Sequence, residues 1–504
     1  MPVSITRRIR HALYAAAAGM ALMTAPVSAA PEAPRPQVTA VPGKPNLMIG
    51  AYDLATLGYQ VDEYFIAGNA TSYRLSGQPE ASGVWTAQPD AAAPYVTRVV
   101  VIRPSDPLKF NGTALVEWFN VTAGQDTPAD WMVAHREMLR KGYAYVGVSA
   151  QKVGVEGGDS IMGQGVSLKK ADPKRYGTLA HPGDAWSYDI FSQAGALLKT
   201  QRAGGLLGPL VPRKVIGIGE SQSAAFLTTY VNAIDRLARV YDGFLIHSRF
   251  GSGAAIDGTR MTAGQGLVPD HVRFRPDLRV PVLTVITETD LLGARLPGYH
   301  ASRRLDDRRL RVWEVAGTAH ADNYLFMGAF TDSGLKRPEE LARIFVPSLN
   351  SPMGKLAKPL NPGMAHHYVV QGALAALNDW VRTGRAPAST PLLTLATGGK
   401  PGETASLALD ANGLAKGGVR TPWVDAPTIR LSGKGDPNSF IGMLGGSGEP
   451  MTKAELEKLY PHGREDYLRR FTTALDAAIA AGHIVREDRA EILAIAAINY
   501  DTAP

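Results

Sequence analysis

Short apolar runs alternate with segments of helical spacing over most of the middle of the chain. The apolar runs are typical of buried strands and lie at residues 63–66, 95–102, 114–119, 142–148, 214–218, 243–246, 280–286 and 310–315. The helical segments lie at residues 127–139, 184–200, 223–237 and 297–305. Buried strands that alternate with helices predict an α/β fold, with a mostly parallel central sheet and helices on both faces.

Two segments interrupt this alternation. Residues 252–279 are rich in glycine and charged residues, and residues 321–365 behave similarly. Long irregular segments between core elements commonly form lids or substrate loops. We therefore predict a core over residues 48–384 with these two lid insertions. Residues 385–504, with strand-like and then helical patterns, are predicted to be an elaboration packed on that core.

The first residues have the layout of a signal peptide. A basic start precedes the apolar run AAAAGMALMTA, and Val27-Ser28-Ala29 offers small residues for cleavage after Ala29. Residues 30–47 are proline-rich and predict a flexible or extended leader. No later stretch reaches about 18 uninterrupted apolar residues, so no membrane insertion of the mature chain is expected. The pattern predicts a periplasmic or secreted protein.

Composition narrows the chemistry further. The 504 residues include no cysteine, which excludes disulfides, thiol nucleophiles and thiolate metal sites. The formal charge is +7, but lysine and arginine are scattered, so we expect no nucleic-acid partner. The segment HPGD at residues 181–184 lacks partners at ligand spacing, and the glycine-rich residues 442–450 lack the lysine of a phosphate loop. We expect neither a metal nor a cofactor.

Ser221 is the candidate nucleophile. It lies in Gly219-Glu220-Ser221-Gln222-Ser223, directly after an apolar strand and before a helical segment. A nucleophile elbow needs this context because the sharp turn lifts the hydroxyl clear of the backbone. The motif ends in serine where a second glycine is usual. We therefore predict that Ser223 is tightly packed and leaves room for no larger side chain.

The acid and the base of a triad follow in the order that this interpretation needs. The strand at 280–286 ends in Thr287-Glu288-Thr289-Asp290, which places carboxylates at the edge of a parallel sheet where functional loops gather. Asp290 is favoured over Glu288 as the acid because it lies farther into the loop. His320 follows the last strand on a loop and is the candidate general base.

Further residues are candidates for binding the substrate. The backbone N–H groups of Gln222 and Val121 are the expected oxyanion donors, because Gln222 begins a helix and Val121 follows the strand at 114–119. The candidate substrate-binding residues are Asn120, Trp118, Tyr324 and His247, and His247 is also the reserve candidate for the base.

Several segments resemble a known family. The order Ser221, Asp290, His320 with GESQS resembles the α/β-hydrolase superfamily. The segments VEWFNVTAG, GYAYVGVSAQ, HPGDAWSYDIF, IGIGESQSA, TETD, EVAGTAHAD and GGVRTPWVD are similar to secreted bacterial α/β-hydrolase-domain proteins of undefined substrate. The resemblance spans most of the mature chain. It implies ester or amide hydrolysis by a Ser-His-acid triad without a cofactor.

The sequence thus predicts a secreted serine esterase acting on a small-molecule carboxylic ester or lactone. A serine peptidase or an acyltransferase would use the same triad. A secreted binding protein that kept the fold without catalysis is the alternative from a different class.

Overall fold

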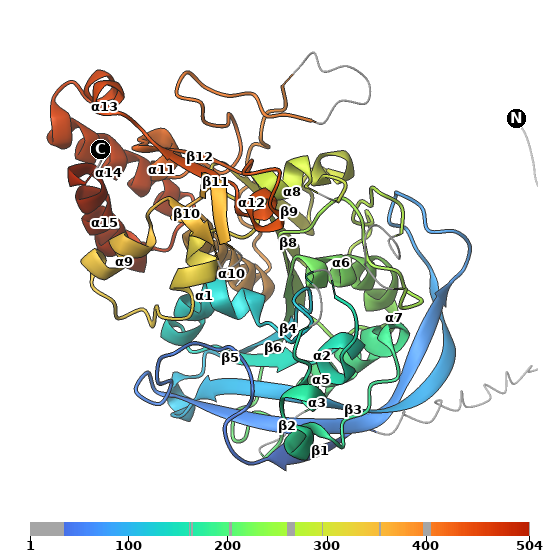
Figure 1. Ribbon diagram of the computed structural model, residues 1–504. Helices are drawn as coiled ribbons and strands as arrows, with labels where there is room; N and C mark the ends of the chain where they lie inside the picture. The colour runs from blue at the N-terminus through green and yellow to red at the C-terminus, as the bar shows by residue number, and fades with distance from the viewer. Residues whose placement is uncertain are drawn as a thin grey trace, which may run out of the picture. The chain divides into compact units, whose positions relative to one another are not determined.

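The central feature of the structure is a sheet with strand order β1-β2-β3-β5-β4-β6-β7-β8-β9 (Figure 1). The computed structural model describes residues 35–160, 162, 165–200, 204–259, 268–294, 296–351, 354–396 and 405–502. The strands are β1 Gln37–Val41, β2 Tyr59–Leu75, β3 Ala87–Pro104, β4 Thr113–Trp118, β5 Ala144–Val148, β6 Lys214–Glu220, β7 Gly243–His247, β8 Val282–Thr287 and β9 Leu310–Val315. Neighbours from β5 to β9 are parallel, and those from β1 to β5 are antiparallel. The predicted mostly parallel sheet is confirmed.

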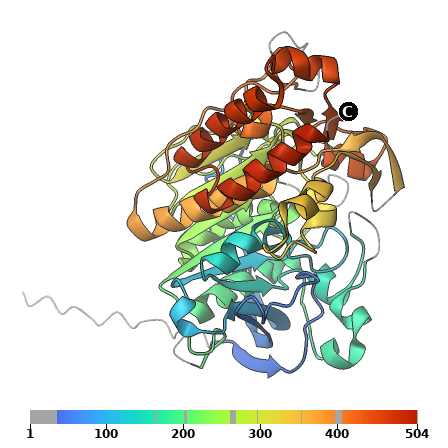
Figure 2. The same ribbon diagram turned by 90° about the vertical axis from the view of Figure 1, so that its left-hand side faces the viewer.

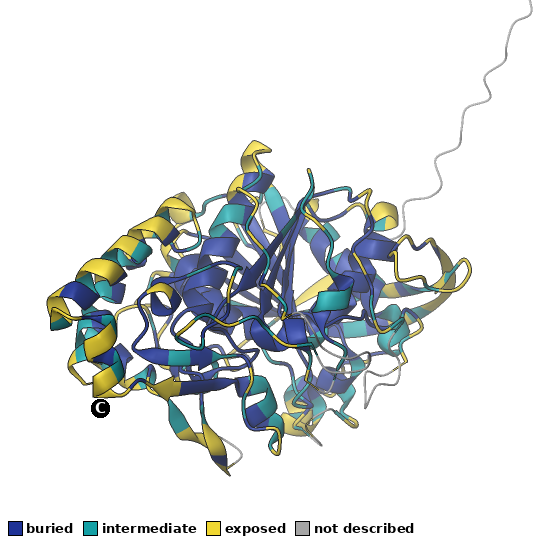
Figure 3. Cartoon of the chain, turned by 90° about the horizontal axis from the view of Figure 1, so that it is seen from above, coloured by how far each residue is buried: buried dark blue, intermediate teal, exposed yellow. Residues whose placement is uncertain are grey.

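Both faces of the sheet are covered because its strands are apolar on both sides. In β6, Ile216 and Ile218 pack into the cluster that includes residues of α1 and α10. Val215 packs into the opposite cluster, which includes residues of α5 and α6. The covering helices are α1 Ala129–Arg140, α10 His366–Thr383, α5 Ser187–Lys199 and α6 Gln222–Thr229. Seen from above, the strands are buried between these layers (Figure 3).

The predicted insertions differ in structure. The described parts of residues 252–279 contain no helix, and residues 260–267 lie outside the described ranges. Residues 321–365 form a π-helical turn, a helix and a hairpin. These elements are the turn Tyr324–Gly328, α9 Pro338–Ile344, β10 Ser348–Ser351 and β11 Gly354–Leu360.

The C-terminal part packs on the core. Residues 35–504 form one compact unit, in which Arg136 of α1 bonds Glu491 of α15 at 2.8 Å and Arg140 bonds Asp488 at 2.6 Å. Figure 2 shows α14 and α15 side by side. The elements are α11 Pro422–Asp425, β12 Ile429–Ser432, α12 Phe440–Gly445, β13 Ser447–Pro450, α13 Lys453–Leu459, α14 Gly463–Ala480 and α15 Arg489–Asp501.

Local structure departs from the sequence pattern in three places. Part of the predicted leader is strand β1, which pairs with β2. The helix expected at 223–237 is divided into α6, a π-helical turn Tyr230–Ile234 and α7 Asp235–Ala238. The prediction did not include this division because apolar spacing alone does not distinguish these helix types. The helix expected at 297–305 is a 3₁₀ turn, Tyr299–Ser302.

Two findings bear on export and on membranes. The predicted signal peptide, residues 1–29, lies outside the described residues. In the ranges that are described, no helix combines the length and the apolar character needed to cross a membrane.

Candidate active site

Ser221 sits on a strained turn between β6 and α6. Its backbone angles, φ of 59° and ψ of −114°, lie in a region that residues other than glycine rarely adopt. Strand and helix approach closely here: a Cβ added to Gly219 would lie 3.1 Å from Cβ of Ser223 and 2.8 Å from Leu227. Ser223 is fully buried, as its predicted tight packing requires.

The packing of Ser223 gives a stability prediction. Its hydroxyl is buried and has no hydrogen-bond partner among the described residues. Ser223→Ala is therefore expected to leave the free energy of unfolding unchanged or raised by up to about 1 kcal/mol, because an unpaired polar group is removed. Ser223→Val is expected to lower it by about 1–3 kcal/mol through overpacking. Urea denaturation of both variants checks this, and equal stability of the two would contradict the tight packing.

Three side chains form a continuous hydrogen-bonded row. Ser221 Oγ lies 2.8 Å from His320 Nε2, and His320 Nδ1 lies 2.6 Å from Asp290 Oδ1. The other oxygen of Asp290 accepts bonds from the N–H and the hydroxyl of Thr287 at 2.8 and 2.7 Å. Burial alone would raise the pKa of Asp290, but His320 and Thr287 outweigh burial and lower it. The row has the geometry of a nucleophile, a base and an orienting acid.

Glu288 faces away from this row. Its two carboxyl oxygens accept bonds from the backbone N–H groups of Gly317 at 2.6 Å and Gly433 at 2.8 Å. Burial raises the pKa of Glu288 to about 7, although both bonds oppose the rise. Of the two carboxylates proposed from the sequence, only Asp290 contacts the imidazole, while Glu288 joins the loop after β9 to the C-terminal part.

Of the two expected oxyanion donors, one already makes a hydrogen bond within the protein. The N–H of Gln222, at the first position of α6, has no acceptor within its helix. The N–H of Val121 donates to the side-chain Oε1 of Gln222 at 3.0 Å. A substrate oxygen can therefore use the Val121 N–H only after Oε1 of Gln222 has moved away.

A cavity of about 720 Å³ opens at Ser221. Asn120 lines it, as expected, together with Gln222 and His320. Its other walls are largely apolar and come from segments far apart in the sequence. Phe326, one of the aromatic residues that the sequence places near the mouth of the site, is among them. Sequence reasoning missed most of the others, which include Met48, Met132, Phe250, Phe330 and the apolar residues of α12.

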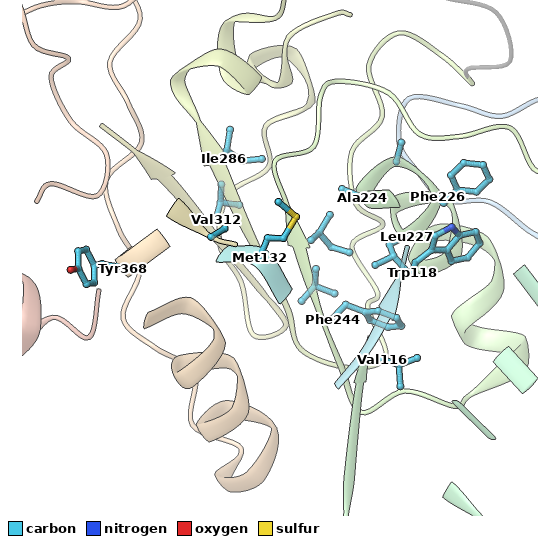
Figure 4. Packing of buried hydrophobic residues seen from close by; sticks show 14 of the residues in the cluster. Val116, Trp118, Met132, Ala224, Phe226, Leu227, Phe244, Ile286, Val312 and Tyr368 are labelled. Carbon is cyan, nitrogen blue, oxygen red and sulfur yellow. The ribbon is translucent and has the colours of Figure 1, made fainter. Parts of the chain in front are cut away.

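Three residues expected to bind substrate are absent from this lining. Trp118 packs against Phe226 of α6 with ring centroids 5.0 Å apart (Figure 4). Tyr324 donates its hydroxyl to Asp332 and stacks on the ring of His367. Both rings are fully buried, so their place in the sequence near strand ends reflected core packing rather than exposure to a ligand. The third, His247, belongs to a buried row.

That buried row lies behind the site and contains four side chains. His247 contacts Asp130 through Nδ1 at 3.0 Å and His366 through Nε2 at 2.8 Å. His366 contacts Asp322 at 2.9 Å. Burial lowers the pKa of His247 well below its usual value and raises that of Asp130 to about 8. His247 thus contacts neither Ser221 Oγ nor the cavity, which removes it as the reserve base.

Glu220, next to the nucleophile, is a site residue that the sequence interpretation did not single out. Its Oε1 lies 3.6 Å from His320 Nε2, and its Oε2 accepts a bond from the amide of Asn120 at 3.2 Å. Burial, with the nearby acids Asp130 and Asp290, raises the pKa of Glu220 well above its usual value. In the sequence, only its position next to Ser221 in GESQS could have indicated that Glu220 belongs to the site.

The described side chains were compared with the arrangements that hold metal ions in proteins. Within the described ranges, no group of three or more histidine, aspartate or glutamate side chains is arranged to hold a metal ion.

Comparison with known proteins gives a family match. The sequence model of the alpha/beta hydrolase domain family matches residues 23–494. No protein of curated function matches the chain.

Several solved structures are similar over part of the chain. Acetyl xylan esterase 1 of a Thermoanaerobacterium species has 9% identity and a TM-score of 0.23, with 42% of this chain and 52% of that chain covered. The glucuronoyl esterase of Solibacter usitatus has 11% identity and a TM-score of 0.27, with 52% and 70% covered. A serine hydrolase without a lid from Xanthomonas campestris has 10% identity and a TM-score of 0.27, with 49% and 83% covered. The match thus spans about half the length of the acetyl xylan esterase.

Proposed function

The chain belongs to the family of alpha/beta hydrolase domain proteins, and from this premise we propose that it is an exported serine hydrolase that cleaves carboxylic esters, lactones included. The main support for the proposal is the hydrogen-bonded row from Ser221 through His320 to Asp290. Ser221, at one end of this row, lines the cavity, where a substrate can contact it. The basic and apolar pattern of residues 1–29 supports export.

The geometry supports a two-step reaction. His320 Nε2 takes the proton of Ser221 Oγ while Oγ attacks the ester carbonyl carbon. The N–H of Gln222 binds the oxyanion, and that of Val121 joins once Oε1 of Gln222 has left it. His320 then returns the proton to the departing alcohol. In the second step His320 deprotonates water, which attacks the acyl carbon. The bond to Ser221 Oγ then breaks, His320 returns the proton to Oγ, and the carboxylic acid leaves.

Two measurements on the wild-type protein test the proposal. p-Nitrophenyl acetate is expected to be hydrolysed, whereas p-nitroacetanilide, the matching amide, should react at least about 10²-fold more slowly because amine is the poorer leaving group. Faster cleavage of the amide would indicate a peptidase. Formation of a new ester with an added alcohol, at the expense of acid, would indicate an acyltransferase.

A covalent probe locates the nucleophile in the same preparation. A fluorophosphonate is expected to add one label per chain at Ser221, found by peptide mass spectrometry. A label on another residue, or the absence of any label and of any ester turnover, would overturn the proposed function.

A further inference from the structure

The wall of the cavity is largely apolar, although the hydroxyl side chains of Thr122, Thr127, Ser160 and Ser252 also contribute to it. Its roof includes Phe440, Ile441, Met443 and Leu444, all from the short helix α12. Phe326 packs with Ile441 in a small hydrophobic cluster separate from the main core. Residues far apart in the sequence thus contribute apolar side chains to the same cavity.

Further lining residues have the same chemistry. Met132 of α1 and Phe250 are two of them, and the ring of Phe250 lies 5.1 Å from that of His320. Methionine side chains are unbranched and polarisable, so a wall that contains several of them adapts to apolar groups of different shape. A cavity of about 720 Å³ is larger than an acetyl group requires.

The two amide side chains next to Ser221 already make hydrogen bonds within the protein. The amide of Asn120 donates to Glu220, and the amide oxygen of Gln222 accepts from Val121. Among the described lining residues, Glu220 and His320 are the only ionisable ones. A substrate rich in hydroxyl groups would lose its bonds to water here and gain few in return.

We propose, on the basis of the proposed function, that the site takes uncharged esters in which the acyl or the alcohol part is a large apolar group. An apolar wall of this size favours such a group because each buried methylene adds favourable transfer free energy. Acetylated sugars and esters with a charged acyl chain fit the wall poorly.

Chain length is the first test. One series varies the acyl chain of p-nitrophenyl esters from acetate to octanoate, and a second varies the alcohol of acetate esters from methyl to octyl. In at least one series kcat/KM is expected to rise about threefold to fourfold per methylene until the cavity is filled. Flat or falling values in both series would overturn the inference. The monoester of p-nitrophenol with succinate, whose acyl chain ends in a carboxylate, should be at least about 10-fold slower than the butyrate.

A wall variant with a matched control is the second test. Met443→Gln keeps the side-chain length but places an amide in the wall. It is expected to lower kcat/KM for the preferred long ester about 10-fold and to leave that for the smallest ester nearly unchanged. Met327→Gln makes the same change at a methionine that is 58% exposed and absent from the lining, so it should affect neither substrate. Equal effects of Met443→Gln on both esters would overturn the inference.

The two proposals fail differently. If only the inference on apolar substrates is wrong, the probe still labels Ser221 and short esters are still hydrolysed, but kcat/KM does not rise with chain length. If the proposed function is wrong, the probe does not label Ser221 and no ester in the series is hydrolysed.

Discussion

Replacement of Ser221 by alanine is expected to lower kcat for ester hydrolysis by about 10⁶-fold, because the attacking oxygen is removed while the rest of the site stays in place. Turnover of p-nitrophenyl acetate by the purified variant measures this, with active-site titration of the wild type to give the true kcat. The unfolding transition of the variant, followed by circular dichroism, should remain cooperative.

Ser223→Ala is the matched control. It also removes a serine hydroxyl, but Ser223 lies two residues after Ser221 and faces the contact between helix and strand. It should keep kcat within a few-fold of the wild type. Residual turnover by Ser221→Ala within about 10-fold of the wild type would contradict the assignment of the nucleophile, whatever the control does.

Replacement of Asp290 by asparagine is expected to lower kcat by about 10⁴-fold, because an amide at this position can donate to His320 Nδ1 and thereby favour the wrong tautomer. The loss should appear in kcat more than in KM, since the cavity wall is unchanged. Steady-state kinetics on the ester of best turnover separates the two constants.

Glu288→Gln is the comparison that makes the result specific. It should retain kcat within about 10-fold, because Glu288 contacts Gly317 and Gly433 rather than the imidazole. It should lower the free energy of unfolding by about 1–3 kcal/mol, because an amide NH₂ cannot accept a bond from a backbone N–H. A larger loss of kcat in Glu288→Gln than in Asp290→Asn would reverse the assignment of the acid.

The elements around Ser221 could be predicted because their signals are local. An apolar strand, a run of small residues and a helix follow one another in the sequence, and the structure has β6, the turn at Ser221 and α6 in the same order. For the acid, the sequence favoured Asp290 over Glu288 only because Asp290 lies farther past the strand, in what was expected to be a loop. In the structure both residues belong to the short helix α8 Glu288–Leu292, where they point in different directions. Which of them contacts His320 therefore depends on tertiary packing.

Most of the apolar wall of the cavity could not be predicted from the sequence. Trp118 and Tyr324 were chosen because they lie near strand ends, but whether a ring faces the core or a ligand depends on helices that pack there from elsewhere in the chain. The residues that do line the wall include Met443, which lies in a segment interpreted as a glycine-rich turn. Its contribution arises only when α12 packs beside β11 and lines the same cavity as Met132 of α1.

The buried row behind the site has a consequence for its hydrogen atoms. Each of its three contacts needs one hydrogen between the two atoms that it joins. Burial raises the pKa of Asp130 to about 8 and lowers the pKa of His247 well below its usual value, so both groups favour their uncharged forms at neutral pH. Asp130 then donates to Nδ1 of His247, and the single hydrogen of this imidazole lies on Nε2 and points to Nε2 of His366. The tautomer of His247 is thereby fixed by a carboxyl group of α1.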